Sequence, residues 1–236
     1  MCRSLALALT FCLFHAIAYA DNDAPGWHGE GEFGLAITSG NSDTETLNGR
    51  LDLVNNTGLW RHTLGLSALS VADGDSTTAE RYTFSYKADK NISENDYLFG
   101  AFRYDDDRFS GFNFQSSLTT GYGRRLFERT RSRLDVELGG GYKFSETTNG
   151  ETQDEVIARL YGDYEHKVSS NALFSQTLLI ETGIENTFTE SISAFKVHFA
   201  EKLALKLSLI VKNNSDVPAG STSTDRISTV AVVYSF

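Results

Sequence analysis

The feature that most constrains the fold is a period-two alternation of apolar and polar side chains, which repeats in short segments from Trp27 to the last residue. In LALKLSLIVK (203–212), leucine or valine occupies every odd position, and lysine or serine occupies most of the even ones. Successive side chains of a strand point to opposite faces, whereas helical spacing fits these segments poorly. The alternation therefore predicts β-strands that each have one apolar and one hydrophilic face.

Twelve such segments are separated by turn residues, and 172–181 is the one whose parity is ambiguous. An even number of strands, each long enough for a tilted membrane strand of roughly 9–11 residues, is typical of outer-membrane barrels. We therefore predict an all-β, transmembrane antiparallel β-barrel of about 12 strands over 27–236, with both termini periplasmic. The predicted strands are 27–38, 44–54, 59–71, 79–90, 96–107, 113–124, 132–144, 153–166, 172–181, 186–199, 202–213 and 225–236.

The first twenty residues have the pattern of a secretory signal peptide. Arg3 precedes an apolar stretch, and Ala18-Tyr19-Ala20 ends it with a small-x-small cleavage pattern. We expect 1–20 to be cleaved, 21–26 to be a short periplasmic lead-in, and the protein to be exported to the outer membrane of a Gram-negative cell. The formal net charge of −10 argues against nucleic acid as a partner.

The hydrophilic strand face carries charges of both signs. Unpaired ions are prohibitively costly in a dry core, so this face does not belong to a β-sandwich. A water-filled or salt-bridged barrel lumen accommodates them. The candidate lumen-lining residues are Arg50, Asp52, Arg81, Lys87, Arg103, Asp135, Glu137, Arg159, Asp163 and Lys206.

The connections after the odd-numbered segments are mostly longer than those after the even-numbered ones, with LFERTRS (126–132) as the exception. In outer-membrane barrels the long loops face outside. Asp105, Asp106 and Asp107 therefore form a candidate extracellular acidic loop. Carboxylates suit hard cations, but consecutive strand residues point to alternate sides, so pairing of Arg108 with an acid is the preferred interpretation. We predict no metal site and no cofactor.

Aromatic side chains on the apolar face fall into two bands, as expected for rings at two lipid–water interfaces. Trp60, Tyr122, Tyr164, Phe199, Tyr234 and Phe236 fall at the short-turn end, and Tyr82, Tyr104, Phe114, Tyr142 and Phe144 at the long-loop end.

The chain ends in STVAVVYSF (228–236), which predicts a lipid-facing strand that closes the barrel against 27–38 and leaves no open edge. Phe236, with Tyr234 two residues earlier, also resembles the C-terminal signal that the outer-membrane assembly machinery reads. We assign these two residues as an assembly signal.

No catalytic constellation is evident. GDST (74–77) resembles the start of one esterase motif with Ser76 as nucleophile, but the Asp-x-x-His that should follow is missing, and the stretch is typical of a turn. His62 alone has apolar-face parity, at the short-turn end, whereas His28, His166 and His198 are interpreted as lumen or turn residues. We therefore predict that the protein is not an enzyme and has no catalytic residues.

Three stretches resemble a known family: GWHGEGEFGLAITSGNSDTETLNGRLDL, FGAFRYDDDRFSGFNFQSSLTTGYGRRLF and the closing TDRISTVAVVYSF. The chain resembles the salt-induced outer membrane proteins of Gram-negative bacteria (YdiY-like), a family of unknown function, over nearly all of 26–236. The resemblance implies an outer-membrane location and expression linked to salt. It implies no established activity and no catalytic residues.

Three functions are compatible with these features. The first is a narrow pore linked to salt or osmotic conditions. The second is a non-conducting structural barrel that interacts with cations or lipopolysaccharide. The third, and least favoured, is an outer-leaflet hydrolase. In each case we expect a monomer, with outer-membrane lipid, lipopolysaccharide and, through the C-terminal strand, the assembly machinery as partners.

Overall fold

A computed structural model describes residues 26–38, 44–73, 76–107, 110–218 and 221–236, and within these the side chains of 36–38, 44 and 76–79 are left aside. The predicted signal peptide, and all of the predicted lead-in except Gly26, therefore lie outside the described residues. The described part contains no helix long and apolar enough to cross a membrane.

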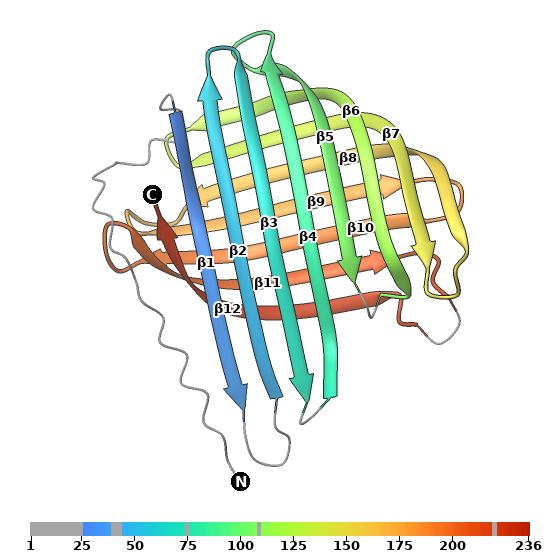
Figure 1. The fold of residues 1–236 in the computed structure, drawn as a ribbon. Coiled ribbons are helices and arrows are strands. Elements are labelled where there is room, and N and C mark those ends of the chain that lie inside the picture. The colour runs from blue at the N-terminus through green and yellow to red at the C-terminus, as the bar shows by residue number, and fades with distance from the viewer. Residues whose placement is uncertain (1–25, 39–43, 74–75, 108–109, 219–220) are drawn as a thin grey trace.

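The described residues form a closed barrel in which each strand pairs antiparallel with its sequence neighbours. In Figure 1 the strands of the front wall and those of the back wall cross at a steep angle, as strongly tilted strands do. The predicted fold class, an antiparallel barrel of about 12 strands, is confirmed. The strands are β1 (Gly26–Thr38), β2 (Thr44–Thr57), β3 (Trp60–Asp73), β4 (Ser76–Asn91), β5 (Asp96–Asp107), β6 (Phe112–Arg129), β7 (Ser132–Thr147), β8 (Thr152–Lys167), β9 (Ala172–Thr182), β10 (Thr187–His198), β11 (Leu203–Asn214) and β12 (Thr224–Ser235).

The barrel closes where the last strand meets the first. Gly31 lies opposite Tyr234 and Phe33 opposite Val232 in the β1–β12 ladder. Beyond the ladder, Gly29 and Phe236 exchange two backbone hydrogen bonds of 3.0 Å. The start of β1 and the end of β12 therefore lie at one end of the barrel, which we call the terminal end; the opposite end is the loop end. The periplasmic orientation of the terminal end stays a prediction.

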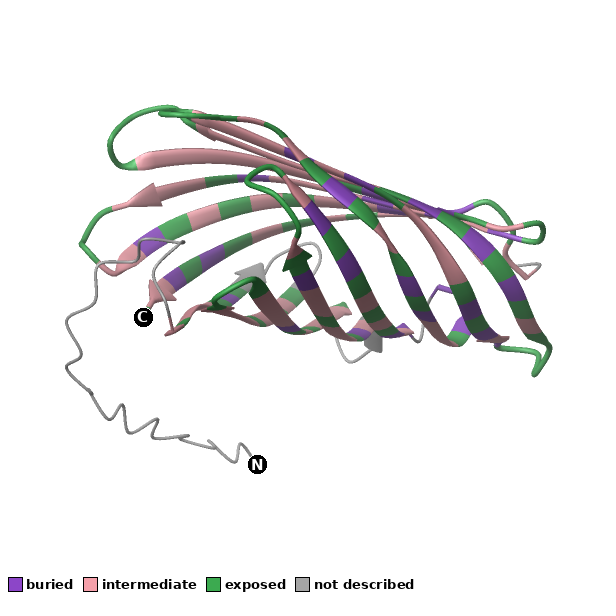
Figure 2. Ribbon diagram, turned by 90° about the horizontal axis from the view of Figure 1, so that it is seen from above, coloured by how far each residue is buried: buried purple, intermediate pink, exposed green. Residues whose placement is uncertain are grey.

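Burial alternates along the strands, which appear as regular bands of buried and exposed residues in Figure 2. On β11, Leu205, Leu207 and Leu209 are exposed, whereas Ala204 and Lys212 are buried. The exposed apolar set faces outward, where lipid would cover it, and the charged set faces the lumen. The outward apolar side chains can thus stabilise the fold only when a membrane surrounds the barrel and removes them from water.

Strand β9, whose parity the sequence leaves ambiguous, has Leu178 outward and Leu179 and Glu181 inward. The ambiguity arises because its outer face carries a polar residue, Gln176. Its amide donates to Ser191 Oγ at 2.9 Å and accepts from Ser193, both on the outer face of β10. Mutual hydrogen bonds make these polar groups tolerable on an apolar wall.

The predicted difference in loop length is confirmed only in part. The strands extend into the predicted loops, so the connections 74–75, 148–151 and 183–186 at the loop end are as short as 58–59 and 92–95 at the terminal end. The connections 39–43 and 215–223, both at the loop end, are longer than any connection at the terminal end. The exceptional loop LFERTRS is also corrected, because β6 continues to Arg129 through an irregularity between Arg125 and Phe127.

Candidate functional site

The charged lumen is the candidate functional site, and all ten candidate lumen-lining residues lie on the inner strand faces. The ten side chains belong to six strands, β2, β4, β5, β7, β8 and β11, and their ion-pair partners add β1, β10 and β12. They do not form one site. The structure divides them into a cluster near the loop end, a cluster deeper in the barrel, and single pairs along the wall near the terminal end.

The first group, which we call the loop-end cluster, consists of Arg103 and Asp105 on β5, Glu190 on β10 and Lys212 on β11. Arg103 donates from Nη1 and Nη2 to the two carboxylate oxygens of Glu190 at 2.8 and 2.9 Å, a bidentate arrangement. Lys212 Nζ lies 3.0 Å from Asp105 Oδ1 and 3.6 Å from Glu190 Oε2. Arg103 also pairs with Asp105, so each charge contacts both opposite charges.

The loop-end cluster joins opposite walls. In the closed strand order β11 lies halfway round the barrel from β5, and β10 is only one strand nearer. The Lys212–Asp105 and Arg103–Glu190 contacts therefore cross the lumen rather than run along the wall. The four side chains are mostly buried against each other, so they form a polar bridge through the barrel interior. A second contact at this level links Arg81 on β4 with Asp225 on β12 at 3.3 Å.

The candidate acidic loop lies elsewhere than predicted. Asp105, Asp106 and Asp107 are the last residues of β5, because the ladder with β4 continues to the pair Arg81–Asp107. Asp105 and Asp107 are buried and face inward, and each forms an ion pair with arginine or lysine. Asp106 has the opposite parity. Arg108, the predicted partner of these acids, lies outside the described residues.

The second group, the mid-barrel cluster, centres on Glu137 of β7, which is fully buried. Its carboxylate accepts from Lys87, from Arg159 Nη1 at 2.6 Å and from the Tyr97 hydroxyl at 3.0 Å. The Arg159 guanidinium also lies over the Phe99 ring, 4.8 Å from its centroid. These contacts connect β4, β5, β7 and β8, which lie on one side of the barrel. The mid-barrel cluster therefore reinforces one wall.

The remaining candidates form smaller pairs nearer the terminal end. Arg133 Nη2 lies 3.3 Å from Asp163, and Arg133 Nε lies 3.7 Å from Asp135. Arg50 and Asp52, two residues apart on β2, pair at the partly exposed inner wall. Lys206 pairs with Glu32 of β1, from a strand only two positions away in the barrel order. None of these pairs reaches the opposite wall.

Several buried polar atoms on the inner faces have no hydrogen-bond partner within the described part of the chain. They include Lys143 Nζ, Asp135 Oδ1 and Gln153 Oε1. Leaving a buried polar group unpaired costs roughly 1–3 kcal/mol, and ordered water commonly satisfies such groups. Water inside the barrel would satisfy these atoms, and the ion-paired, partly unsatisfied interior differs from a dry apolar core.

The described residues contain no cluster of histidine, cysteine, aspartate or glutamate suited to a metal ion. His62 lies on the outer face, where its Nδ1 is 2.9 Å from the Tyr86 hydroxyl. The interpretation of His166 as a lumen or turn residue is wrong. Because β8 extends to Lys167, His166 stays in the ladder opposite Ser132, stacks on the outward-facing Tyr164, and lies 2.8 Å from Ser132 Oγ. The side chain of Ser76 is not among the described ones.

The assembly-signal residues lie on the outer face at the closing seam. The rings of Tyr234 and Phe236 stack with centroids 6.2 Å apart. Glu190 and Lys212 have the parity of the hydrophilic strand face but are not among the ten sequence-based candidates, because alternation assigns a face and does not show which charges meet across the lumen.

A closed, tilted, antiparallel barrel with an apolar outer wall and an ion-paired, hydrated lumen has the fold of the small outer-membrane porins. The NanC porin is 10% identical over 89% of this chain and 98% of its own, with a TM-score of 0.53. An outer membrane channel from Pseudomonas putida F1 is 13% identical over 94% of this chain and 100% of its own, also with a TM-score of 0.53. At these identities the similarity concerns the fold alone.

The chain belongs to the family described as "Protein of unknown function, DUF481", whose model matches residues 31–236. It is also 28% identical to the uncharacterized protein YdiY of Escherichia coli (strain K12) over 205 residues, which are 86% of this chain and 80% of that protein. The resemblance to YdiY-like proteins is thus confirmed, and it brings no established activity with it.

Proposed function

We propose that the protein is a narrow passive channel of the outer membrane, which admits water, ions or small solutes past the loop-end cluster. The observation that supports this proposal is the set of ion pairs that join opposite walls, Arg103 with Glu190 and Lys212 with Asp105. They bridge, at one level, a lumen whose walls carry many charged and polar side chains beside a smaller number of apolar ones. A barrel of this strand number is wider than an eight-stranded barrel filled by its own side chains and smaller than the 16-stranded porins.

The balance of charge in the lumen supports a passive and weakly selective path. The loop-end cluster contains two cations and two anions, all within ion-pair distance. No large excess of either sign at this level would attract one type of ion strongly. The described residues also offer no metal-binding cluster that would couple transport to a cofactor.

The cellular setting completes the proposal. The signal-like first twenty residues and the porin fold support export and insertion into the outer membrane, with the terminal end periplasmic. We expect a monomer that contacts outer-membrane lipid and lipopolysaccharide and no nucleic acid. Tyr234 and Phe236 would be read by the assembly machinery, so deletion of Phe236 should lower the heat-modifiable, membrane-inserted fraction and leave export across the inner membrane unchanged.

The link to salt comes from the family resemblance, and the loop-end cluster offers a physical route for it. High ionic strength shortens the Debye length from about 10 Å at 0.1 M to about 3 Å at 1 M, although partly buried pairs are screened less than exposed ones. If salt loosens the cluster, conductance divided by bulk conductivity should rise between 0.1 and 1 M KCl. A constant ratio would place the salt link in expression alone.

Reconstitution of the wild-type protein in a planar lipid bilayer tests the proposal. The expected result is small stepwise conductance, below that of the 16-stranded porins. Absence of steps at any voltage, with the barrel folded and inserted, would contradict the channel and favour the structural alternative. That alternative is weakened by one observation: Asp105 and Asp107, which the sequence offers for cations that bridge lipopolysaccharide, already pair inside the lumen.

A hydrolase stays the third candidate, and we propose that the protein is not an enzyme. The Ser132–His166 hydrogen bond has two members of a nucleophile–base pair, but no carboxylate is hydrogen-bonded to the second imidazole nitrogen among the described residues. Incubation with phospholipid vesicles should release no fatty acid. Release that disappears in Ser132→Ala or Ser76→Ala would contradict this.

A further inference from the structure

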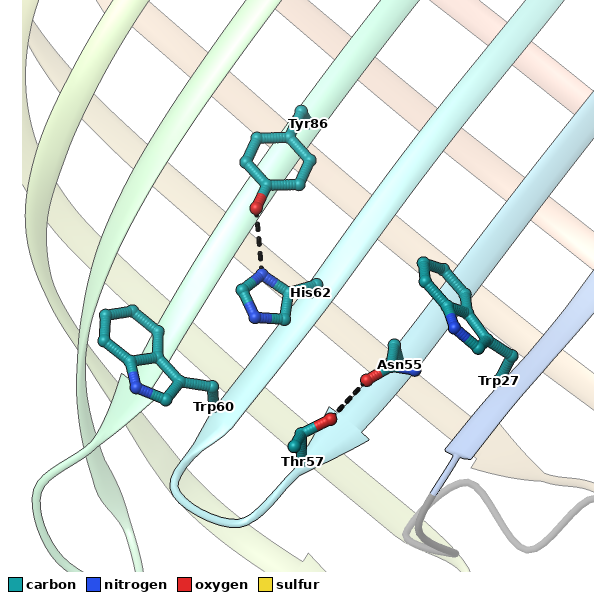
Figure 3. Close-up of a pocket in the computed structure, with 6 residues that line it drawn as sticks. All are labelled: Trp27, Asn55, Thr57, Trp60, His62 and Tyr86. Atoms are coloured by element: carbon teal, nitrogen blue, oxygen red, sulfur yellow. Dashed lines mark hydrogen bonds between the residues drawn. The ribbon is translucent and has the colours of Figure 1, made fainter.

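A shallow cavity of about 500 Å³ lies on the outer wall of β1–β4, near the terminal end, away from the lumen. Figure 3 shows its six lining residues on the outward face of these strands. The alternation pattern assigns Trp60 to an aromatic band and His62 to the apolar face, but it does not bring the six residues together. The lining residues are Trp27, Asn55, Thr57, Trp60, His62 and Tyr86.

The cavity has an aromatic wall with polar atoms set into it. His62 is stacked between Trp60 and Tyr86, with ring centroids 6.0 and 6.1 Å away, and its Nδ1 lies 2.9 Å from the Tyr86 hydroxyl. Trp27, which is 67% exposed, lies on the opposite side of the cavity. The indole N–H groups, the phenol, the imidazole and the Asn55 amide supply hydrogen-bonding groups next to apolar ring surface. Such a mixture suits a ligand that is itself half polar and half apolar.

One cation lies beside this wall. Lys90, an exposed residue near the end of β4, places its Nζ 5.7 Å from the centroid of the Trp60 ring. It has no ion pair with any residue of the described ranges, whereas Arg124, an exposed cation at the same end of the barrel, lies 3.5 Å from Asp96. Lys90 is therefore an uncompensated positive charge at the edge of an aromatic cavity.

The position of the cavity along the barrel axis indicates what kind of molecule covers it. Tryptophan and tyrosine at the end of an apolar barrel wall lie where hydrocarbon meets headgroups, and lysine side chains reach from there to the water. A phospholipid presents acyl chains, ester carbonyls and a phosphate in that same order. The ammonium group matches the phosphate, the hydrogen-bond donors match the esters, and the rings match the acyl chains.

We propose that this cavity is a binding site for an anionic glycerophospholipid of the leaflet at the terminal end, with Lys90 contacting the phosphate and Trp27, Trp60, His62 and Tyr86 holding the glycerol and upper acyl region. The uncompensated positive charge of Lys90 favours an anionic lipid over a zwitterionic one. Other cations at the terminal end, such as Lys167, also attract anionic lipid, so the test must separate the effect of Lys90 from theirs. The proposal does not depend on whether the lumen conducts.

The chain supplies its own probe, because it contains two tryptophans, Trp27 and Trp60, and both line the cavity. All tryptophan fluorescence therefore reports on this site. The experiment uses the folded protein in phosphatidylcholine vesicles with a fixed small fraction of brominated lipid, either brominated phosphatidylglycerol or brominated phosphatidylcholine. Bromine on the upper acyl chain quenches tryptophan at short range.

The expected result is that brominated phosphatidylglycerol quenches as though about five-fold enriched at the tryptophans over brominated phosphatidylcholine, the factor that one lysine supplies at a membrane surface. Lys90→Gln should reduce this preference to about one. Lys167→Gln, which removes the same charge from an exposed position at the terminal end of β8, is the matched control and should keep it. Heat-modifiable mobility on gels should be unchanged in both variants.

Three outcomes would overturn the proposal. The first is equal quenching by the two lipids in the wild type, which would reduce the cavity to an ordinary part of the aromatic band. The second is a preference that survives Lys90→Gln or disappears in Lys167→Gln, which would show a diffuse charge effect. The third is a saturable change in tryptophan emission on adding inorganic phosphate to protein in pure phosphatidylcholine, which would assign the site to a free anion.

Discussion

The two lumen clusters contain similar side chains, but they connect different parts of the barrel. The loop-end cluster joins β5 to β10 and β11, on the far side of the lumen. The mid-barrel cluster joins β4, β7 and β8, with β5 contributing Tyr97 and Phe99, all on one side. In the proposed channel the first cluster sets the width of the passage, whereas the second joins neighbouring strands of one wall. Ion pairs in a barrel can therefore serve permeability or stability according to the strands that they connect.

The largest effect should follow removal of the whole loop-end cluster by the neutral quadruple change Arg103→Ala, Asp105→Ala, Glu190→Ala and Lys212→Ala. Loss of four charged side chains from one level of the lumen should raise the permeation of small sugars several-fold. Swelling of proteoliposomes measures this. An unchanged swelling rate for a correctly folded variant would mean that the width is set at another level.

The mid-barrel cluster should respond in stability instead. Glu137→Ala leaves Lys87, Arg159 and the Tyr97 hydroxyl without their shared acceptor, so the free energy of unfolding should fall by about 3–5 kcal/mol. Urea unfolding in detergent micelles measures the loss. Glu137→Gln keeps an acceptor and should cost clearly less. A fall in stability of equal size for Glu190→Ala would erase the distinction between the clusters.

A smaller effect, on ion selectivity, should follow when the charge of the loop-end cluster is changed. Glu190→Gln leaves the loop-end cluster with excess positive charge, so the reversal potential in a KCl gradient should shift toward anion preference. Lys212→Gln should shift it toward cation preference by a similar amount. The same sign of shift in both variants would show that neither residue faces the conduction path.

The smallest effect is expected for Arg50→Gln. The Arg50–Asp52 pair lies within one strand, is partly exposed, and does not cross the lumen. Exposed pairs of this kind contribute about 0–1 kcal/mol. The urea midpoint should therefore shift little, and single-channel conductance should stay the same. A change as large as that of Glu137→Ala would show that the wall pairs matter as much as the buried cluster.

Much of the fold could be predicted from the sequence because a barrel wall imposes a simple local rule. The alternation of LALKLSLIVK assigns both faces of β11 without knowledge of its neighbours, and most strand limits agree within a few residues. The prediction is wrong where the local rule is interrupted. In β6 the irregularity between Arg125 and Phe127 shifts the parity, so a continuing strand looks like a turn. In β8 the last residues still pair, which places His166 on the outer face.

The candidate sites were less predictable because they depend on distance across the barrel. Parity assigns Arg103, Glu190 and Lys212 to the lumen, but their contact requires the curvature and tilt of the closed sheet. The same holds for the outer cavity, whose six residues come from four strands. From the sequence, Trp27 and Tyr86 cannot be distinguished from other aromatic residues at a membrane interface. Only the strand register shows that they line the same cavity as Trp60 and His62.

The central claim is that ion pairs between opposite walls narrow a conducting lumen, and single-channel recording in planar bilayers tests it most directly. Arg103→Ala/Glu190→Ala removes a pair that crosses the lumen, and Lys206→Ala/Glu32→Ala removes a pair that stays along one wall. Both double variants leave the net charge unchanged. We predict small steps for the wild type, several-fold larger steps for the first variant, and nearly wild-type steps for the second. Equal conductance in all three proteins, or none in any of them, would contradict the claim.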